Sequence, residues 1–168
     1  NAVAIPMNLA SIPNNPAGVG DRNDFAFILS QSFHIQDQKI SAFGLSYGKG
    51  AFHASFSGYI GSVDDIEART EPTAEPLYLF DARQLYFLTN LAYRINDHMT
   101  MGGSVRTISE TIDLDNMNTT SYDLGFLART EYVDIGLSIT NLGGTVSYNE
   151  IHYELPLTYS LGISSKYR

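Results

Sequence analysis

The sequence predicts an all-β fold, namely an antiparallel up-and-down transmembrane β-barrel. Apolar and polar residues alternate with a period of two in about eight segments, as expected for strands with one apolar and one polar face. The links between these segments are long at one end of the predicted sheet and short at the other, as in outer-membrane barrels. Only 17% of the 168 residues are charged and 12% are aromatic, which suits an outer face that does not meet water.

The chain divides into an irregular start and a long region of strands. Residues 1–23 are rich in Asn, Pro and Gly and predict an N-terminal lead-in on the periplasmic side, with turns near residues 13–20. Residues 24–168 are expected to form the barrel, with strands close to the ~9–11 residues that a tilted membrane strand needs. In chain order the predicted strands are Phe25–Phe33, Ile40–Tyr47, Ala51–Ile60, Leu85–Ile95, Met99–Ile112, Tyr122–Thr130, Val133–Ile139 and Leu157–Arg168.

Each predicted strand carries aromatic or aliphatic residues on one face and mainly small or polar residues on the other. The apolar faces of the first four are Phe25, Phe27, Leu29 and Phe33; Phe43, Leu45 and Tyr47; Phe52, Ala54, Phe56 and Ile60; and Leu85, Phe87, Leu91, Tyr93 and Ile95. The fifth strand alternates least, with Met101 and Val105 facing away from Ser104 and Arg106. The apolar faces of the last three are Tyr122, Leu124, Phe126 and Ala128; Val133, Ile135, Leu137 and Ile139; and Leu157, Tyr159, Leu161 and Ile163.

The lengths of the predicted links are sorted by end. If the strands run up and down, one end carries long links at about 34–39, 61–76, 113–119 and 141–155, and the other carries only 48–50, 96–98 and 130–131. A soluble sandwich has no reason to sort its loops in this way. Outer-membrane barrels do so, because they have short periplasmic turns and longer outside loops.

Four tyrosines lie at the short-turn ends of predicted strands: Tyr47, Tyr93, Tyr132 and Tyr167. They predict an aromatic girdle at one membrane interface, where a ring with a polar tip is favoured. By parity Tyr132 falls on the polar face and the other three fall on the apolar face. The alternative is that Tyr is simply common in strands.

Charged residues on the polar face would lie inside the barrel, at Arg94, Arg106, Asp123 and Arg129. Arg106 and Asp123 are on neighbouring strands and could pair across a hairpin. Such charges escape the cost of facing lipid, and they could tune selectivity or hold an internal plug. The favoured interpretation is a structural ion pair inside the barrel.

The predicted link 61–76 is charged, with Asp64, Asp65, Glu67, Arg69, Glu71 and Glu75. A solvated loop that binds a partner is the interpretation retained, since recognition is usually carried by loops on a rigid scaffold. A calcium site is the alternative, but the loop lacks an Asp-x-Asp pattern with a closing Gly and Glu.

Other classes of function find little support. The formal net charge of −8 argues against a nucleic-acid partner, and the absence of Cys excludes disulfides and thiolate metal sites. The histidines, His34, His53, His98 and His152, show no metal-ligand spacing, and no catalytic constellation is apparent. The sequence therefore predicts a protein that is not an enzyme, with neither a catalytic nor a metal site and no cofactor.

Motifs along nearly the whole chain resemble one family. NNPAGVG (14–20) resembles a segment near the start of a bacterial outer-membrane barrel family that includes the PorV and PorQ proteins of type IX secretion and is distantly similar to FadL-type transporters. Further similar phrases follow in the same order: YGKGAFHASFSGYIGSVDDIEART, LTNLAYRINDHMTMGGSVRTI, SYDLGFLART, VDIGLSITNLGG and ELPLTYSLGISSKY.

The resemblance implies a larger barrel of about fourteen strands, of which the eight predicted here would be a part. The chain departs from the family pattern in three ways: a Gly-rich segment near the start is absent, Arg106 stands where Lys is frequent, and the chain stops where the family continues. It is therefore expected to be an incomplete piece or a shortened relative.

The predicted function is that of a non-enzymatic barrel in the bacterial outer membrane, a subunit or a cargo- or partner-binding component of a secretion or cell-surface complex. Its expected partners are outer-membrane lipid and other envelope proteins. One alternative, also from the resemblance, is a FadL-like transport barrel for hydrophobic or small solutes. The other is a soluble β-sandwich adhesin or filament subunit whose apolar faces form a core.

Overall fold

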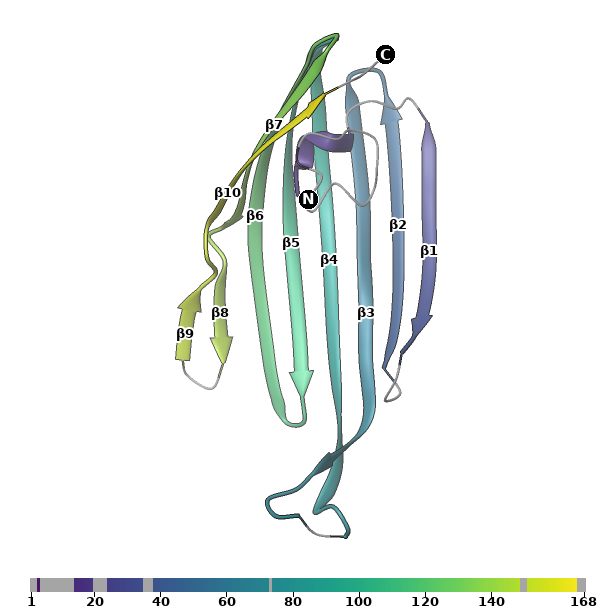
Figure 1. The fold of residues 1–168 in the computed structure, drawn as a ribbon, viewed down its shortest axis with the longest axis vertical. Coiled ribbons are helices and arrows are strands. Elements are labelled where there is room, and N and C mark those ends of the chain that lie inside the picture. Colours follow the sequence, from purple (N-terminus) through teal and green to yellow (C-terminus); the bar gives the residue numbers. More distant parts are fainter. Residues whose placement is uncertain are drawn as a thin grey trace.

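The structure is an all-β protein built around one antiparallel sheet, as Figure 1 shows. The computed structural model describes Val3 and residues 14–19, 24–34, 38–72, 74–148 and 151–165. A short 3-10 helix, η2 (Pro16–Val19), precedes the strands. These are β1 (Phe25–Phe33), β2 (Lys39–Lys49), β3 (Phe52–Ala68), β4 (Tyr78–Asn96), β5 (Met99–Ile112), β6 (Asp115–Arg129), β7 (Val133–Leu142), β8 (Thr145–Tyr148), β9 (Ile151–Glu154) and β10 (Thr158–Ser165).

The strands run up and down in chain order, β1-β2-β3-β4-β5-β6-β7-β10, and every neighbouring pair is antiparallel. β8 pairs with β6 beyond the end of β7, and β9 pairs with β8. Within the described residues β1 pairs only with β2 and β10 only with β7, so the sheet is open (Figure 1). The predicted all-β antiparallel meander is confirmed, whereas the closed barrel is not what the described sheet forms.

Two predicted strands have the observed bounds, β1 and β5, and others are longer than predicted. β3 continues through Gly61–Ala68 and β4 begins at Tyr78, so the link predicted at 61–76 is a strand up to Ala68. A bulge between Val63 and Ile66, with Asp65 at a φ of 57°, interrupts the alternation there. Bulges of this kind hide a strand from period-two analysis because they reverse its faces.

The other predicted long links also differ. The link predicted at 113–119 is a tight turn at Asp113–Leu114, because β6 begins at Asp115 with polar residues that still form the ladder with β5. The region predicted as a loop at 141–155 contains the end of β7 and the β8–β9 hairpin. The links at the predicted long-loop end are therefore shorter than expected, and the difference in link length between the two ends is smaller than the sequence predicts.

The two faces of the sheet are inverted relative to a water-soluble protein. Here "inner face" means the face on which η2 lies, and "outer face" means the opposite one. Buried polar residues, mostly on the inner face, include His53, Ser55, Asn90, Ser104, Ser121, Asp123, Arg129, Asp134 and Ser138. Exposed large apolar residues, mostly on the outer face, include Phe25, Phe27, Leu29, Phe52, Leu91, Tyr93, Met101, Leu124, Leu137, Tyr159, Leu161 and Ile163. Soluble proteins rarely expose an apolar surface of this extent, so the outer face is suited to an apolar environment.

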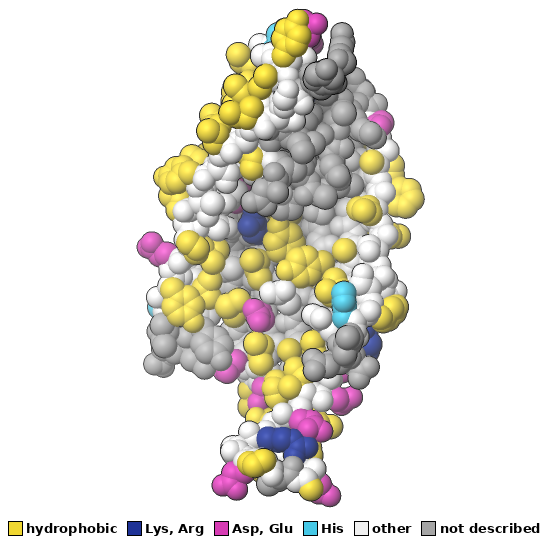
Figure 2. All heavy atoms as spheres, viewed as in Figure 1, with side chains coloured by type: hydrophobic (Ala, Val, Ile, Leu, Met, Phe, Trp, Pro, Cys, Tyr) yellow, Lys and Arg dark blue, Asp and Glu magenta, His cyan; other side chains and the backbone are white. Residues whose placement is uncertain are grey.

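The ends of β3 and β4 extend past the rest of the sheet as a narrow projection, seen at the bottom of Figure 1. Figure 2 shows that Asp and Glu side chains gather on it, together with Arg. The sheet is thus an apolar-sided wall with an acidic extension at one end. Among the described residues, no helix is long and apolar enough to cross a membrane.

Candidate functional site

The inner face is organised around a buried ion pair between neighbouring strands. Arg106 on β5 donates from Nη2 to Oδ2 of Asp123 on β6 at 2.9 Å. The Asp123 side chain is 0% exposed and that of Arg106 is 15% exposed. In the register Ser104 lies opposite Asp123 and Arg106 lies opposite Ser121, so the pair is diagonal. The structure brings together the two charges that the sequence placed on facing strands.

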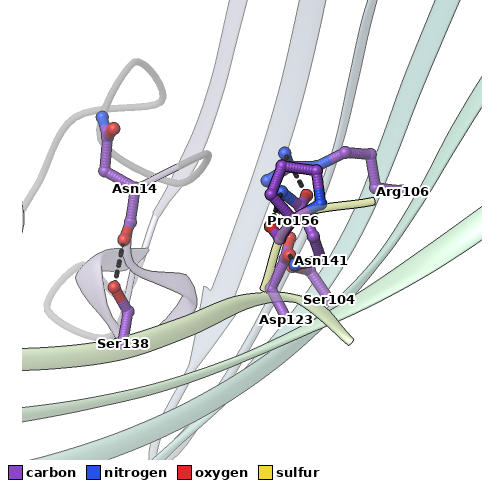
Figure 3. A network of polar contacts seen from close by, with 7 residues as sticks. All are labelled: Asn14, Ser104, Arg106, Asp123, Ser138, Asn141 and Pro156. Atoms are coloured by element: carbon purple, nitrogen blue, oxygen red, sulfur yellow. Dashed lines mark hydrogen bonds and ion pairs between the residues drawn. The ribbon is translucent and has the colours of Figure 1, made fainter. Parts of the chain in front are cut away.

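The Asp123 carboxylate also holds neighbouring backbone in place (Figure 3). Ser104 Oγ donates to Oδ2 at 2.9 Å, and the backbone N–H of Asn141 donates to Oδ1 at 3.0 Å. The Asn141 side chain accepts from Arg106 Nη1 at 3.3 Å and donates to the Pro156 carbonyl at 3.1 Å. The Asp123 carboxylate therefore links β5, β6 and β7, and the Asn141 side chain extends this network to the segment that leads into β10.

Asn141 marks a break in the sheet. Its φ is 67° and that of Gly143 is also 67°, which is the left-handed region, and β7 gives way to β8 within the next few residues. The register between β6 and β7 shifts between Tyr122 and Leu124, beside Asp123. Because a broken ladder leaves backbone groups without their usual partners, the network around Asp123 satisfies part of what the break exposes.

Aromatic side chains extend this network along the inner face. The Arg106 guanidinium lies 5.9 Å from the centre of the Tyr86 ring, within cation–π range. Tyr86 stacks on Tyr59 with ring centres 5.0 Å apart, and the Tyr59 hydroxyl donates to Gln84 Oε1 at 3.0 Å. Together with Asp123 and Asn141 these groups form a polar belt from β3 to β7.

The N-terminal segment that contains η2 is packed on the inner face. The Asn15 side chain is buried and donates to the carbonyl of Phe126 on β6 at 3.1 Å. Figure 3 shows the second contact, in which Ser138 Oγ on β7 donates to the Asn14 carbonyl at 2.7 Å. Asn15 Oδ1 in turn accepts from the N–H of Ala17 at 3.0 Å, which closes a local turn. The segment thus fills part of the concave side of the sheet.

Two glycines make this packing possible. Gly102 on β5 and Gly125 on β6 lie directly opposite each other. A Cβ at Gly102 would be 2.5 Å from the Pro16 carbonyl carbon, and one at Gly125 would overlap Asn15 Oδ1. Larger side chains at either position would displace the segment. Sequence reasoning missed this contact, although the paired glycines were a signal for it.

Some buried inner-face groups find no hydrogen-bond partner among the residues that the structure describes. They are Nδ2 and Oδ1 of Asn90, Oγ1 of Thr119 and Oγ of Ser121. Buried polar groups are normally hydrogen-bonded, so this face is chemically suited to polar solvent or solute rather than to an apolar ligand.

The other two predicted interior charges lie away from the belt. Arg94 donates from Nη2 to the Gly50 carbonyl at 3.0 Å, in the turn between β2 and β3. Arg129 is buried on the inner face, opposite the buried Asp134 of β7 in the register. Neither residue joins Arg106 and Asp123.

Three of the predicted girdle tyrosines are exposed: Tyr47, Tyr93 and Tyr132. Tyr93 packs on Phe52 with ring centres 4.9 Å apart, at the tight-turn ends of β3 and β4. Tyr132 lies in the turn between β6 and β7. Tyr167 is outside the described residues.

The projecting ends of β3 and β4, residues 63–82, are here called the acidic ribbon. Lys39 contacts Asp64 at 2.8 Å, and its hydrogen bond and positive charge lower the pKa of that carboxyl. The Tyr78 hydroxyl donates to Asp113 at 2.9 Å, and this contact raises the pKa of Tyr78.

The remaining predicted residues of the ribbon are solvent-facing or close to the surface. Arg69 pairs with Glu67 at 2.7 Å, and the backbone N–H of Asp65 donates to Asp81 at 3.3 Å. Glu71 and Glu75 are exposed. Among the described residues, no group of three or more acidic or histidine side chains has the arrangement of a metal site.

A serine and a histidine meet elsewhere, at Ser147 and His152, with Oγ and Nδ1 2.7 Å apart. They are directly opposed residues of the exposed β8–β9 hairpin. This is the geometry of an ordinary cross-strand pair.

The buried ion pair should dominate local stability. We expect Asp123→Ala to lower the free energy of unfolding by about 3–5 kcal/mol, because it leaves Arg106 without its main partner in a buried site. Replacing both residues, Arg106→Met with Asp123→Leu, should recover part of that loss, because it removes the unpaired charge but leaves Ser104 Oγ and the Asn141 N–H without the Asp123 acceptor. Urea unfolding followed by circular dichroism measures both. The control is Asp64→Ala, whose exposed pair with Lys39 should contribute little, and an equal loss in that control would contradict the assignment.

The glycine pair should control docking of the N-terminal segment. The chain has no Cys, so Ala17→Cys provides a single buried label site. We expect Gly102→Ala or Gly125→Ala to raise its maleimide-labelling rate by about tenfold, equivalent to about 1.4 kcal/mol of lost docking free energy. Gly103→Ala is the matched control, because a Cβ there meets only ordinary contacts at 3.7 Å. Equal rates in all three backgrounds would show that the glycines do not hold the segment.

Comparisons with protein-family models, curated proteins and solved structures found no match to this chain. The resemblance to the PorV and PorQ family therefore stays a prediction from the sequence motifs.

Proposed function

We propose that this chain forms the wall of a non-enzymatic β-barrel in the bacterial outer membrane. In this proposal it acts as a subunit or partner-binding component of a secretion or cell-surface complex of the PorV and PorQ kind. The membrane location is supported by one observation, that the apolar face of the sheet is exposed and the polar face is covered. Large apolar side chains are exposed on the outer face, whereas Asp123, Ser121 and Asn90 are buried on the inner one.

The height of the apolar band on β4 supports a membrane-spanning role. On the outer face of this strand, the residues from Leu85 to Ile95 are apolar except Thr89, with Arg83 and Asp81 beyond Leu85. This stretch is about 33 Å long at about 3.3 Å per residue. A strand tilt of about 40° reduces it to about 25 Å, the height of the apolar band in outer-membrane barrels.

Closure of the barrel is a requirement of the proposal. In lipid, the free backbone groups of β1 and β10 would each cost several kcal/mol, so both edges must be paired. They would pair with each other or with further strands. The resemblance implies the second route, in a barrel of about fourteen strands.

The acidic ribbon is the proposed partner-binding surface. It stands clear of the apolar band and combines exposed acids with exposed Leu77 and Leu79. Charged groups there would steer a partner with a basic surface, and the apolar residues would add buried area. A β-ribbon is also stiffer than the loop predicted from the sequence, so less ordering cost accompanies binding.

A FadL-like transport barrel remains the second candidate, favoured by the buried polar groups of the inner face, Asn90, Thr119 and Ser121. Such a lining suits small polar solutes more than hydrophobic ones. Solute-driven swelling of liposomes tests this candidate function. The protein is tested without residues 1–20, because the N-terminal segment fills part of the inner face, and a lack of solute permeability in this variant would argue against transport. A soluble β-sandwich is less well supported, because it needs a second layer over the outer face.

Two arginine substitutions on one strand test the membrane assignment. Leu91 and Leu79 both belong to β4 and are 66% and 52% exposed, but only Leu91 lies within the apolar band. In lipid, Leu91→Arg should destabilise the protein by about 2–4 kcal/mol, whereas Leu79→Arg should cost about 0–1 kcal/mol. Reversible unfolding in phospholipid vesicles measures both values. If the two variants are equally stable, the outer face meets water and the proposal is wrong.

A second experiment tests the ribbon. Neutralising Asp65, Glu67, Glu71 and Glu75 to the corresponding amides should reduce recovery of envelope partners in cross-linked pull-downs by about tenfold, because steering by charge is lost. Neutralising exposed acids at the opposite end of the sheet, by Asp97→Asn with Glu131→Gln, provides the control. Unchanged recovery by the ribbon variant would remove the ribbon from the binding surface without affecting the membrane assignment.

A further inference from the structure

We propose that the outer face holds one phospholipid molecule, with an acyl chain in a groove over Ala54 and Gly103 and its phosphate at Lys49. The inference rests on the proposed membrane function and deepens it. It follows from the shape of the outer face, from the identity of the residues that form the groove, and from the position of a single cation.

The groove exists because small residues interrupt a row of large ones. Ala54, Leu91, Gly103 and Leu124 lie side by side across β3, β4, β5 and β6 in the register. The depression has a volume of ≈ 460 Å³. Its size falls in the range of pockets that hold small molecules.

The backbone around the groove floor does not require a glycine at position 103. A Cβ at Gly103 would meet only Asp123 O and Leu124 Cδ2, each at 3.7 Å, which is ordinary contact. The neighbouring Gly102 is different, because η2 packs directly on it from the inner face. Folding therefore accounts for Gly102, whereas the open space at Gly103 is available to a ligand.

Aromatic side chains border the groove at the tight-turn end. Phe52 and Tyr93 pack together with ring centres 4.9 Å apart, and Tyr47 lies near them on β2. Rings with polar tips prefer the level of the lipid head groups. The groove thus runs from the apolar band towards the membrane interface.

Lys49 supplies the charge. It ends β2, lies opposite Phe52 in the register and lines the same groove. In the described part of the chain it takes part in no ion pair. An ammonium group at this level attracts an anionic phosphate.

A second groove on the outer face provides an internal comparison. It has a volume of ≈ 480 Å³ and is bordered by Leu137, Ile139, Tyr159 and Leu161, with no charged residue in its lining. Any acyl chain can occupy such a surface, but nothing in it distinguishes one head group from another. Of these two grooves, the one at Lys49 carries a charge in its described lining, so head-group selectivity is assigned to it.

Native mass spectrometry of the detergent-solubilised protein tests the inference, with phosphatidylglycerol and the diacylglycerol of the same chains as probes. We expect phosphatidylglycerol to bind at least tenfold more tightly than diacylglycerol. Lys49→Gln should abolish this preference. Gly103→Leu and, independently, Ala54→Leu should weaken both lipids about tenfold by filling the floor, while Leu137→Phe in the second groove should have no effect.

Flotation with vesicles separates this inference from the proposed function. Failure of the wild-type protein to float would overturn both. Flotation of the wild type, with equal lipid binding by all four folded variants, would overturn only the phospholipid site, because binding would then be general partitioning. Loss of selectivity in Lys49→Gln, together with loss of affinity in either filling variant, supports the site.

Discussion

Strict alternation in a single sheet is the constraint on which the rest of this structure depends. Successive side chains of a strand point to opposite faces, so one layer cannot bury both faces. Here the polar face is the one that receives internal cover, from η2 and the N-terminal segment. The apolar face, with Leu91 and Leu161 among its residues, is left for the surroundings. The hydrophobic effect therefore acts between protein and environment rather than inside the protein.

Cohesion of the described sheet accordingly rests on its ladders and on polar contacts of the inner face. The Asp123 carboxylate accepts from Arg106, Ser104 and the Asn141 backbone, and so joins elements that a core would normally hold together. Small residues on the inner face allow the backbone of the N-terminal segment to pack closely against the sheet. Gly102 and Gly125 let the turn at Asn15 and Pro16 approach closely enough for the Asn15 side chain to donate to the Phe126 carbonyl.

The strands and contacts that could be predicted from the sequence are those that follow regular alternation. β1 and β5 have the predicted bounds, and Arg106 and Asp123 could be placed on facing strands because both fall at inward positions. The extension of β3 was missed because the bulge at Asp65 reverses the faces, and the start of β6 because its polar residues carry no apolar face. The roles of Asn141 and Asn15 were missed because they depend on contacts between distant segments, which periodicity does not encode.

Docking of η2 also has a consequence for the order of assembly. The hairpins join residues that are close in the chain, whereas the bond from Ser138 to Asn14 spans 124 positions and that from Asn15 to Phe126 spans 111. Distant contacts form slowly, because the entropy of closing a long loop must be overcome first. The segment around Asn14 and Asn15 precedes the strands in the chain, yet it finds its place only once β6 and β7 exist. Until then the inner face is open, and a folding factor could reach Gly102 and Gly125.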